Sequence, residues 1–196
     1  MKKKIEGFED EKELKIFEDG LKNKNELIFH FWKISLNLAL RVSDTLKITI
    51  KEANQYLKNG YYISKDKKTK KANQVALNEN CMKSIKRALE IRKKIKLNVE
   101  NEFLFVGQGN RALNNRNHIS RISIHNIYTD IADYYNLKTK ISTHTARKTW
   151  GLVVYKKTNN ISLVMKRLNH SSERMTLEYI GLTQKKMDDT VIEFNL

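Results

Sequence analysis

The chain has 196 residues, of which 40% are hydrophobic and 31% charged, and its formal net charge is +16. This length is enough for one domain with its own core, and no segment approaches the roughly 18 apolar residues of a membrane-spanning helix. The single cysteine, Cys81, excludes an internal disulfide, and without a second cysteine a zinc site is not expected. The positive charge favours nucleic acid as a partner, although a codon usage rich in lysine and asparagine accounts for part of it.

The spacing of apolar residues is helical through most of the chain. Two short segments, 61–64 and 74–77, instead have the pattern of hairpin strands with a lysine-rich connection, and 103–106 is a short buried segment. Ser43 is a candidate cap for a short helix after Arg41. The expected fold is therefore mainly α with a small antiparallel β-sheet (α+β), and its longer helices are expected at 9–22, 25–40, 79–97, 117–135, 143–156, 160–168 and 172–180.

Four side chains in the last third of the chain fall at spacings that suggest one active site. His144 and Arg147 are three residues apart, which places them on one face if the segment is helical, and His170 and Tyr179 follow. A guanidinium, two imidazoles and a phenol on a basic protein suit the binding of a phosphodiester and attack on it by tyrosine. Because a phenol ordinarily has a pKa of ~10, attack at neutral pH needs cationic neighbours and a positioned base.

An ordered pattern appears when the rest of the chain is included. Arg41 is followed by Ser43 and Asp44, and a lysine-rich hairpin lies between this segment and His144-x-x-Arg147. In this order the chain resembles the catalytic domain of the tyrosine recombinases, the family of the phage integrases and Xer proteins. The resemblance covers most of the chain and implies that fold, with a catalytic set of Arg41, Lys68, His144, Arg147, His170 and Tyr179.

The resemblance assigns phosphate binding and leaving-group protonation to three cationic side chains. Arg41 and Arg147 would hold the scissile phosphate with planar donor forks, and a helix-end salt bridge with Asp44 is the alternative for Arg41. Lys68 would protonate the leaving 5′ oxygen, and its spacing in the hairpin favours it over Lys70. A solvated run of charge is the alternative for both lysines.

The remaining positions concern the nucleophile and the DNA backbone. Tyr179 would attack the phosphate, with a packed aromatic residue as the alternative reading. His144 would accept or relay its proton, and His170 would donate to a non-bridging oxygen. Three lysines are expected to contact DNA: Lys70, Lys71 and Lys148. For Lys148, a solvent-facing position without DNA contact is an equally open alternative.

Several positions depart from the residues usual in the family without removing a functional group. Ala39 stands where a glycine often precedes the first arginine, and Lys148 stands where a histidine often follows the second. Asn169 replaces a frequent glycine before His170, and asparagine is the next-best residue for a left-handed turn. These departures bear on local geometry rather than on the chemistry.

The resemblance also implies a reaction and partners. DNA strands would be cut and rejoined through a covalent 3′-phosphotyrosyl link, which conserves bond energy, so no ATP is required. Arg41, Arg147 and the two histidines would stabilise the pentacoordinate phosphate, and the sequence has no carboxylate cluster to hold a metal, so no metal or other cofactor is expected. Double-stranded DNA is the expected partner. The protein is expected to be a homotetramer on synapsed DNA and a monomer in free solution, and an accessory DNA-bending or recombinase partner is possible. The gene is expected to be bacterial or phage-borne. The protein is expected in the cytoplasm, associated with the nucleoid and without a membrane partner.

We expect one catalytic domain over residues 1–196, with a core at about 10–183. The tail at 184–196 would either pass to a neighbouring protomer or pack on its own domain. No N-terminal core-binding domain is expected, and both a naturally short chain and a truncated one fit this length. Three rival functions stay open: a non-catalytic DNA-binding modulator of recombination, a type IB topoisomerase, and a lysine-rich RNA-binding protein. Against the third, the sequence has no aromatic RNA-binding motif.

Overall fold

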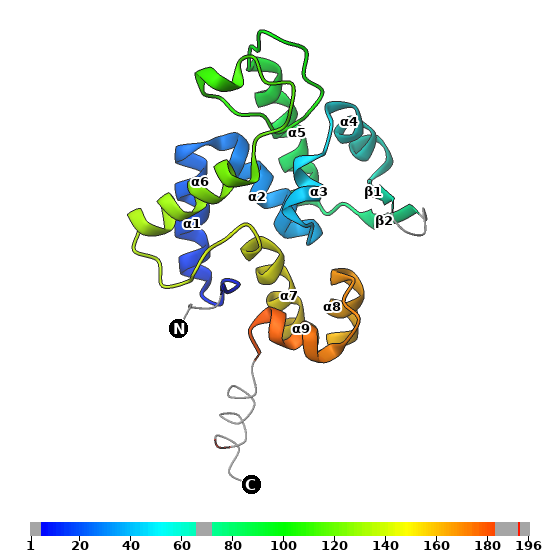
Figure 1. Cartoon of the computed structure of the whole chain (residues 1–196). Coiled ribbons are helices and arrows are strands. Elements are labelled where there is room, and N and C mark those ends of the chain that lie inside the picture. Colours follow the sequence, from blue (N-terminus) through cyan, green and yellow to red (C-terminus); the bar gives the residue numbers. More distant parts are fainter. Residues whose placement is uncertain (1–4, 66–71, 183–191, 193–196) are drawn as a thin grey trace.

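The computed structural model describes residues 5–65, 72–182 and 192. Helices make up most of the described chain, and the two strands form one antiparallel hairpin, which confirms the predicted fold class (Figure 1). The first elements are α1 (Glu11–Lys24), α2 (Glu26–Leu38), α3 (Val42–Leu46), α4 (Ile50–Asn59), β1 (Tyr61–Lys65) and β2 (Ala72–Ala76). They are followed by α5 (Glu79–Lys94), the 3-10 turn η1 (Asn110–Ala112), α6 (Arg121–Tyr134), α7 (Thr145–Thr158), α8 (Ile161–Leu168) and α9 (Glu173–Ile180).

Helix α2 lies inside the larger of two hydrophobic cores and packs against α1, α5 and α7. Most of its side chains are apolar and buried, as expected for a helix surrounded by protein. Phe17 of α1, Trp32 of α2 and Tyr128 of α6 meet edge to face, with ring centroids 4.9 to 5.6 Å apart. These aromatic contacts hold α6 against α1 and α2.

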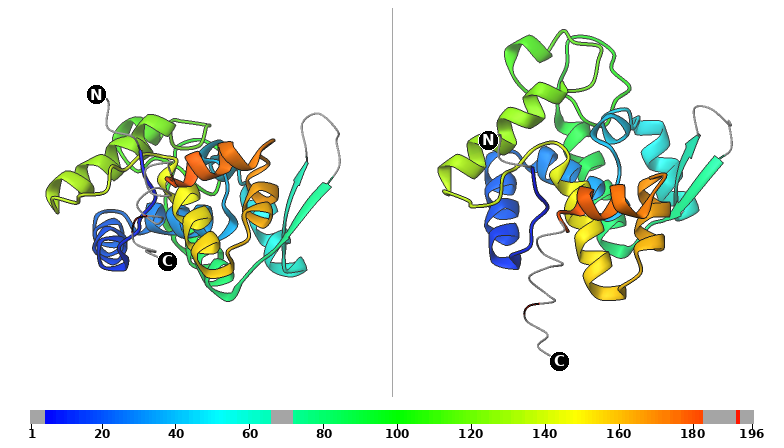
Figure 2. Two further views of the ribbon diagram at one scale, coloured as in Figure 1. Left: turned by 90° about the horizontal axis from the view of Figure 1, so that it is seen from below. Right: turned by 60° about the horizontal axis from the view of Figure 1, so that its bottom comes forward.

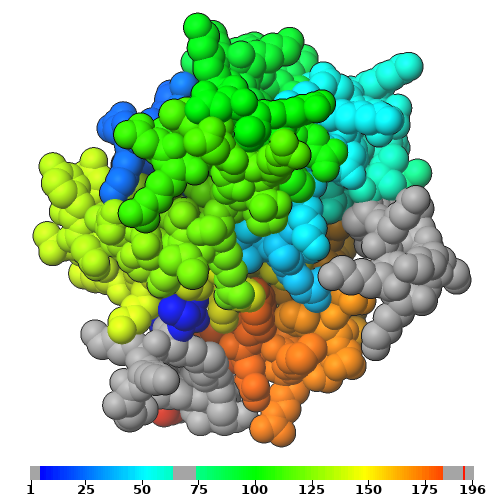
Figure 3. All heavy atoms as spheres, turned by 45° about the horizontal axis from the view of Figure 1, so that its top comes forward, coloured from blue at the N-terminus to red at the C-terminus, as the bar shows by residue number. Residues whose placement is uncertain are grey.

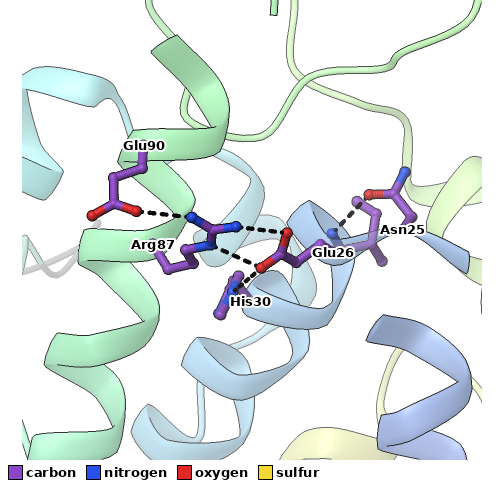
Figure 4. Close-up of polar contacts among 6 residues, drawn as sticks. Asn25, Glu26, His30, Arg87 and Glu90 are labelled. Atoms are coloured by element: carbon purple, nitrogen blue, oxygen red, sulfur yellow. Dashed lines mark hydrogen bonds and ion pairs between the residues drawn. The ribbon is translucent and has the colours of Figure 1, made fainter. Parts of the chain in front are cut away.

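A group of ion pairs joins α2 to α5 (Figure 4). The carboxylate of Glu26 accepts hydrogen bonds of 2.8 and 3.1 Å from Arg87, which also donates to Glu90 at 3.0 Å. His30 lies one turn further along α2, with its Nε2 3.8 Å from a Glu26 oxygen, and is buried. The lysine- and arginine-rich α5 is thereby fixed to the central helix.

Helices α7, α8 and α9 form a group with a second, smaller core, coloured yellow to orange-red in Figures 1 and 2. Leu152, Val164, Leu168 and Ile180 are buried there together with Ala39, which follows α2. The end of α2 is therefore a point at which the two cores meet.

Three described helices end in a left-handed residue that is not glycine: α2 at Ala39, α7 at Asn159 and α8 at Asn169. Asn169 follows α8 with φ 50°, which confirms the left-handed turn expected there. Ala39 follows α2 with φ 48°, a conformation that costs an L-residue about 1–2 kcal/mol and that glycine adopts freely. The structure thus keeps at Ala39 the turn geometry expected of a glycine.

Two local features differ from the sequence-based expectations. The predicted Ser43 cap is wrong: the chain becomes helical at Val42, so Arg41 takes the cap position and Ser43 lies within α3. Helix α4 was not predicted, because it is mostly polar and the apolar pattern is correspondingly weak. Its signals are local instead, namely a capping box between Thr49 and Glu52 and a left-handed Gly60 after its last residue.

The hairpin extends away from the helical body in both views of Figure 2. Its strands pair from Tyr61 opposite Ala76 to Lys65 opposite Ala72, and the connection at 66–71 lies outside the described residues. The tail at 184–196 is described only at residue 192, so its exchange between protomers stays a prediction. Within the described ranges, none of the helices has the length and apolar character needed to cross a membrane.

Candidate active site

Arg147 joins three helices at the meeting point of the two cores. It lies in the first turn of α7, is 6% exposed, and donates from Nη1 to the Ala39 carbonyl and from Nη2 to the Leu168 carbonyl. Both carbonyls belong to helix C-terminal ends, which carry partial negative charge and lack helical partners. Burial lowers the pKa of Arg147 to about 10, so the guanidinium stays charged at neutral pH.

Tyr179 lies near the end of α9, half-buried beside Arg147. Its ring meets the His170 ring edge to face, with centroids 4.9 Å apart. Burial raises the pKa of the phenol, while the charge and hydrogen bonding of Arg147 and the charge of Arg41 oppose that rise. The net shift is upward, so in the resting structure the phenol is protonated and needs a base before it can attack.

His170 follows the left-handed Asn169 and is held by Thr176 of α9. Its Nδ1 is 3.1 Å from the Thr176 hydroxyl, which donates its own proton to the Ser172 carbonyl. The hydroxyl therefore accepts from the ring Nδ1–H, and a neutral His170 has its lone pair on Nε2. Burial, followed by the charge of Arg147, lowers the pKa of His170 and keeps the ring neutral at physiological pH.

His144 immediately precedes α7 and is half-buried. Its Nε2 lies 3.4 Å from Nη2 of Arg121, the first residue of α6, whose Nε donates to the Thr143 hydroxyl at 3.3 Å. Burial is the largest cause that lowers the pKa of His144, and the charge of Arg121 is the next. A neutral His144 can accept a proton, as the predicted role requires.

Arg41 stands at the cap position of α3, exposed to solvent. The charge of Arg41 lowers the pKa of His144, His170, Arg147 and Tyr179, so Arg41 lies within electrostatic range of all four. Within the described part of the chain, no ion pair joins Arg41 to Asp44, so the alternative of a helix-end salt bridge has no support. In Figure 3 the light-blue surface that includes α3 borders the orange surface of α8 and α9.

Lys148 is 8% exposed, which excludes the solvent-facing alternative. Its Nζ donates to the backbone carbonyl of Tyr179 and lies 4.3 Å from the centroid of that ring. The predicted contact of Lys148 with DNA is not tested by this arrangement. Lys68, Lys70 and Lys71 lie outside the described residues, so their roles also stay predictions.

The site thus collects five of the six predicted catalytic side chains, from the α2–α3 turn, the start of α7, the loop after α8 and α9. Two cationic guanidinium groups can bind a tetrahedral anion, two neutral imidazoles can take up a proton, and a phenol can act as nucleophile. Among the described residues, His, Cys, Asp and Glu form no group of three or more that could hold a metal ion.

A family model described as the phage integrase family matches residues 11–186. The chain belongs to the phage integrase family. Members of this family are tyrosine recombinases, so the match agrees with the ordered set of residues found in the sequence.

Individual proteins agree with the family match. The chain is 33% identical over 164 residues to a probable integrase/recombinase, YoeC, of Bacillus subtilis (strain 168), covering 84% of this chain and 82% of that one. It is 26% identical to a probable integrase/recombinase of Acholeplasma phage L2, covering 84% of this chain and about half, 52%, of that protein.

Solved structures of family members share the fold. The XerA recombinase superposes with a TM-score of 0.70 at 18% identity, covering 98% of this chain and 67% of that one. The XerH recombinase bound to its palindromic difH substrate superposes with a TM-score of 0.69 at 19% identity, covering 96% of this chain and 53% of that one. The helical arrangement around Arg147 is therefore the fold of the family's catalytic domains.

Two basic residues near the site were not predicted from the sequence. Arg121 contacts His144 from a position 23 residues earlier in the chain, and Arg167 of α8 donates to the Leu38 carbonyl beside Ala39. Neither arginine stands in a motif, and each reaches its partner only through the packing of separate helices. Their placement was not available from the sequence pattern.

Proposed function

We propose that this protein is a site-specific DNA recombinase of the integrase or invertase type, which cleaves and rejoins DNA through a covalent 3′-phosphotyrosyl intermediate. The observation that carries the proposal is the packing of Tyr179 against His170 and Arg147, with the charge of Arg41 acting on the same phenol. These groups come from separate elements, and their meeting at one tyrosine is what an attack on a phosphodiester requires.

In this proposal Arg41 and Arg147 bind the scissile phosphate. The two carbonyls bonded to Arg147 take one N–H from each Nη atom, so further N–H groups of the guanidinium are left for phosphate oxygens. Both arginines stay charged as the pentacoordinate phosphate forms and stabilise its added negative charge. No metal is needed for this stabilisation.

Proton transfer completes the proposed reaction. Tyr179 Oη attacks the phosphorus, its proton passes to His144, and the bond to the 5′ oxygen breaks as Lys68 protonates it. His170 hydrogen-bonds a non-bridging oxygen; because its Nε2 carries a lone pair in the resting structure, this requires uptake of a proton, which an adjacent phosphate anion favours. The 5′ hydroxyl of the partner strand then attacks the phosphotyrosyl link and releases Tyr179.

The proposed partner is double-stranded DNA, contacted by Lys70, Lys71 and other basic side chains of a chain with net charge +16. The XerH relative was solved bound to its difH substrate, and a lambda integrase relative was solved as a dimer bound to a core site. The proposal also includes the assembly state: the protein forms a homotetramer on synapsed sites and is a monomer in free solution. Accessory proteins act with it on DNA.

Covalent trapping tests the proposal. Purified protein is mixed with nicked duplexes drawn from the DNA that flanks its own gene, and an SDS-resistant protein–DNA adduct is expected. Tyr179→Phe removes the nucleophilic oxygen and keeps the ring, so the adduct is expected to disappear while DNA binding persists. Tyr155→Phe, on α7, is the matched control and is expected to retain the adduct.

The other outcomes separate the rival functions. Binding without an adduct contradicts the proposal and favours a non-catalytic modulator of recombination. An adduct together with relaxation of supercoiled plasmid, and no joining of two sites, favours a type IB topoisomerase. Adduct formation that survives Tyr179→Phe rejects Tyr179 as the nucleophile.

A further inference from the structure

Lys148 makes two contacts with the tyrosine that the proposed function names as nucleophile. Its Nζ donates to the Tyr179 backbone carbonyl and also lies over the face of the same ring, 4.3 Å from the centroid. Lys148 itself is 8% exposed. An ammonium is strongly hydrated, so a buried position is stable only when polar and aromatic groups of the protein replace the lost water.

The carbonyl contact completes the end of α9. The last carbonyls of a helix lack partners within the helix. After α9 the chain turns at Gly181, whose N–H donates to Glu178, and Leu182 donates to the Leu177 carbonyl. The Tyr179 carbonyl follows those of Leu177 and Glu178 along the helix, and Lys148 donates a hydrogen bond to it. The orientation of the residue that carries the phenol thus depends on a side chain of α7.

The backbone of Lys148 is itself held in place. The N-terminal segment crosses α7 there: a Cβ added to Gly7 would lie 2.8 Å from the carbonyl carbon of Lys148. The next residue along, Phe8, donates its N–H to the Thr149 hydroxyl at 2.9 Å. Lys148 therefore reaches Tyr179 from a fixed base rather than from a mobile loop.

The charge of Lys148 also has a consequence for the site. A cation over an aromatic face attracts the ring, and it attracts a phenolate more strongly than a phenol because negative charge spreads into the ring. The same charge lowers the pKa of His144, which keeps that ring neutral and able to accept the Tyr179 proton. Both effects act in the direction that a tyrosine nucleophile needs.

We propose that Lys148 is a positioning residue for Tyr179, which fixes the end of α9 through the Tyr179 carbonyl and favours the phenolate through its ammonium over the ring. This inference rests on the proposed function and adds a residue to that site. It gives Lys148 a role other than the DNA contact predicted from the sequence.

Three substitutions separate the two contacts of Lys148. Lys148→Met keeps an unbranched side chain, one atom shorter, and removes both the donor and the charge. Lys148→Gln keeps a donor for the Tyr179 carbonyl without the charge, and Lys148→Arg keeps both. Lys157→Met is the matched control, because Lys157 is an exposed lysine on the same helix. Circular dichroism and urea unfolding establish that each variant is folded.

The first measurement is the single-turnover rate of adduct formation on saturating nicked DNA as a function of pH. Lys148→Met is expected to slow the reaction roughly 10- to 100-fold near neutral pH, as misplaced reacting groups do, and to recover rate as the pH rises. Lys148→Arg is expected to restore most of the rate. Lys148→Gln is expected to form the adduct faster than Lys148→Met. Like Lys148→Met, it is expected to recover rate only as the pH rises, because it also lacks the charge.

The second measurement needs no catalysis. Protein labelled with 13C at the tyrosine ring is titrated by NMR, and the Tyr179 signal is identified by its loss in Tyr179→Phe. The pKa of Tyr179 is expected to be higher in Lys148→Met and Lys148→Gln than in the wild type or in Lys157→Met. An unchanged pKa in both variants overturns the proposal, whether or not the wild type forms an adduct.

DNA binding distinguishes the competing role. If Lys148 contacts the DNA backbone, Lys148→Met weakens binding, and the slope of log K against log salt falls by about 0.9 for the lost phosphate contact. If Lys148→Met binds DNA more weakly in this way but forms the adduct at the wild-type rate on saturating DNA, the proposal is overturned. Absence of an adduct in the wild type rejects the proposed function, and the NMR titration then decides the role of Lys148 on its own.

Discussion

The titratable groups around Tyr179 are shifted mainly by loss of water. Burial is the largest cause that lowers the pKa of His144 and His170 and raises the pKa of Tyr179, and neighbouring cations reinforce the first two shifts and oppose the third. The resting site therefore has neutral imidazoles and a protonated phenol. A bound phosphate would add a negative charge beside them, which favours proton transfer from the phenol to an imidazole.

Arg121 allows a direct test of how a neighbouring charge shifts the pKa of His144. Its guanidinium lies 3.4 Å from the His144 ring and is the largest charge-based cause of the lowered pKa. Arg121→Met is therefore expected to raise the pKa of His144, because one nearby positive charge no longer disfavours the imidazolium. A titration of the histidine ring signals by NMR measures this shift.

The control is Arg116→Met, which removes an exposed arginine from the loop before α6. It is expected to leave the His144 titration nearly unchanged. Equal shifts in the two variants would contradict a local effect of Arg121 and would attribute the lowered pKa to the overall charge of the protein.

At the scale of elements, the position of the nucleophile depends on how α9 packs against α7. Gly151 of α7 faces Ile180, the residue after Tyr179: an added Cβ would lie 2.7 Å from Ile180 Cγ2 and 3.4 Å from atoms of Leu168 and Val164. Ile180 is buried and branched at Cβ, so it cannot easily turn away. Glycine at this position permits the close approach of the two helices.

Gly151→Ala is expected to destabilise the fold by about 1–3 kcal/mol, the usual cost of overpacking a core, and to slow adduct formation by displacing α9. Urea unfolding measures the first effect and the trapping assay measures the second. Gly109→Ala is the control, since φ is −83° there and nothing lies within 4 Å of an added Cβ. A Gly151→Ala protein that behaves like this control would show that the helices separate without consequence.

At the scale of the whole molecule, histidines link stability to pH. Burial lowers the pKa of His30 between α2 and α5; the Glu26 carboxylate opposes this shift, while the charges of Arg87 and Lys22 add to it. His144 and His170 are shifted in the same direction. Below the ordinary histidine pKa of 6.5, the unfolded chain binds protons that the folded chain does not.

The free energy of unfolding is therefore expected to be greatest above about pH 7 and to fall as the pH decreases toward about 5. His30→Leu removes one of the responsible groups, so its stability is expected to fall less over this range. Urea unfolding at a series of pH values gives the comparison. His125→Leu, an exposed position on α6, is the control, and an identical pH dependence in the two variants would contradict the role of His30.

Local signals account for much of what the sequence predicted correctly. The helices and the hairpin follow from apolar spacing, and the left-handed turn at Asn169 follows from the conformational range of asparagine. Where the apolar pattern was weak the prediction failed, as for α4, whose capping box and following glycine were present in the chain. The Ser43 cap was wrong because α3 begins at Val42, one residue before that serine, with Arg41 at the cap position.

The sequence by itself determined which functional groups the protein has and their order along the chain, and these were enough to indicate the tyrosine recombinases. Only the tertiary structure decided how the groups meet. Arg147 bonds the ends of two other helices, Arg121 lies against His144, and Lys148 turns inward to Tyr179. The physical reason is that burial and contact between residues distant in the chain depend on how helices pack, and no local pattern encodes that packing.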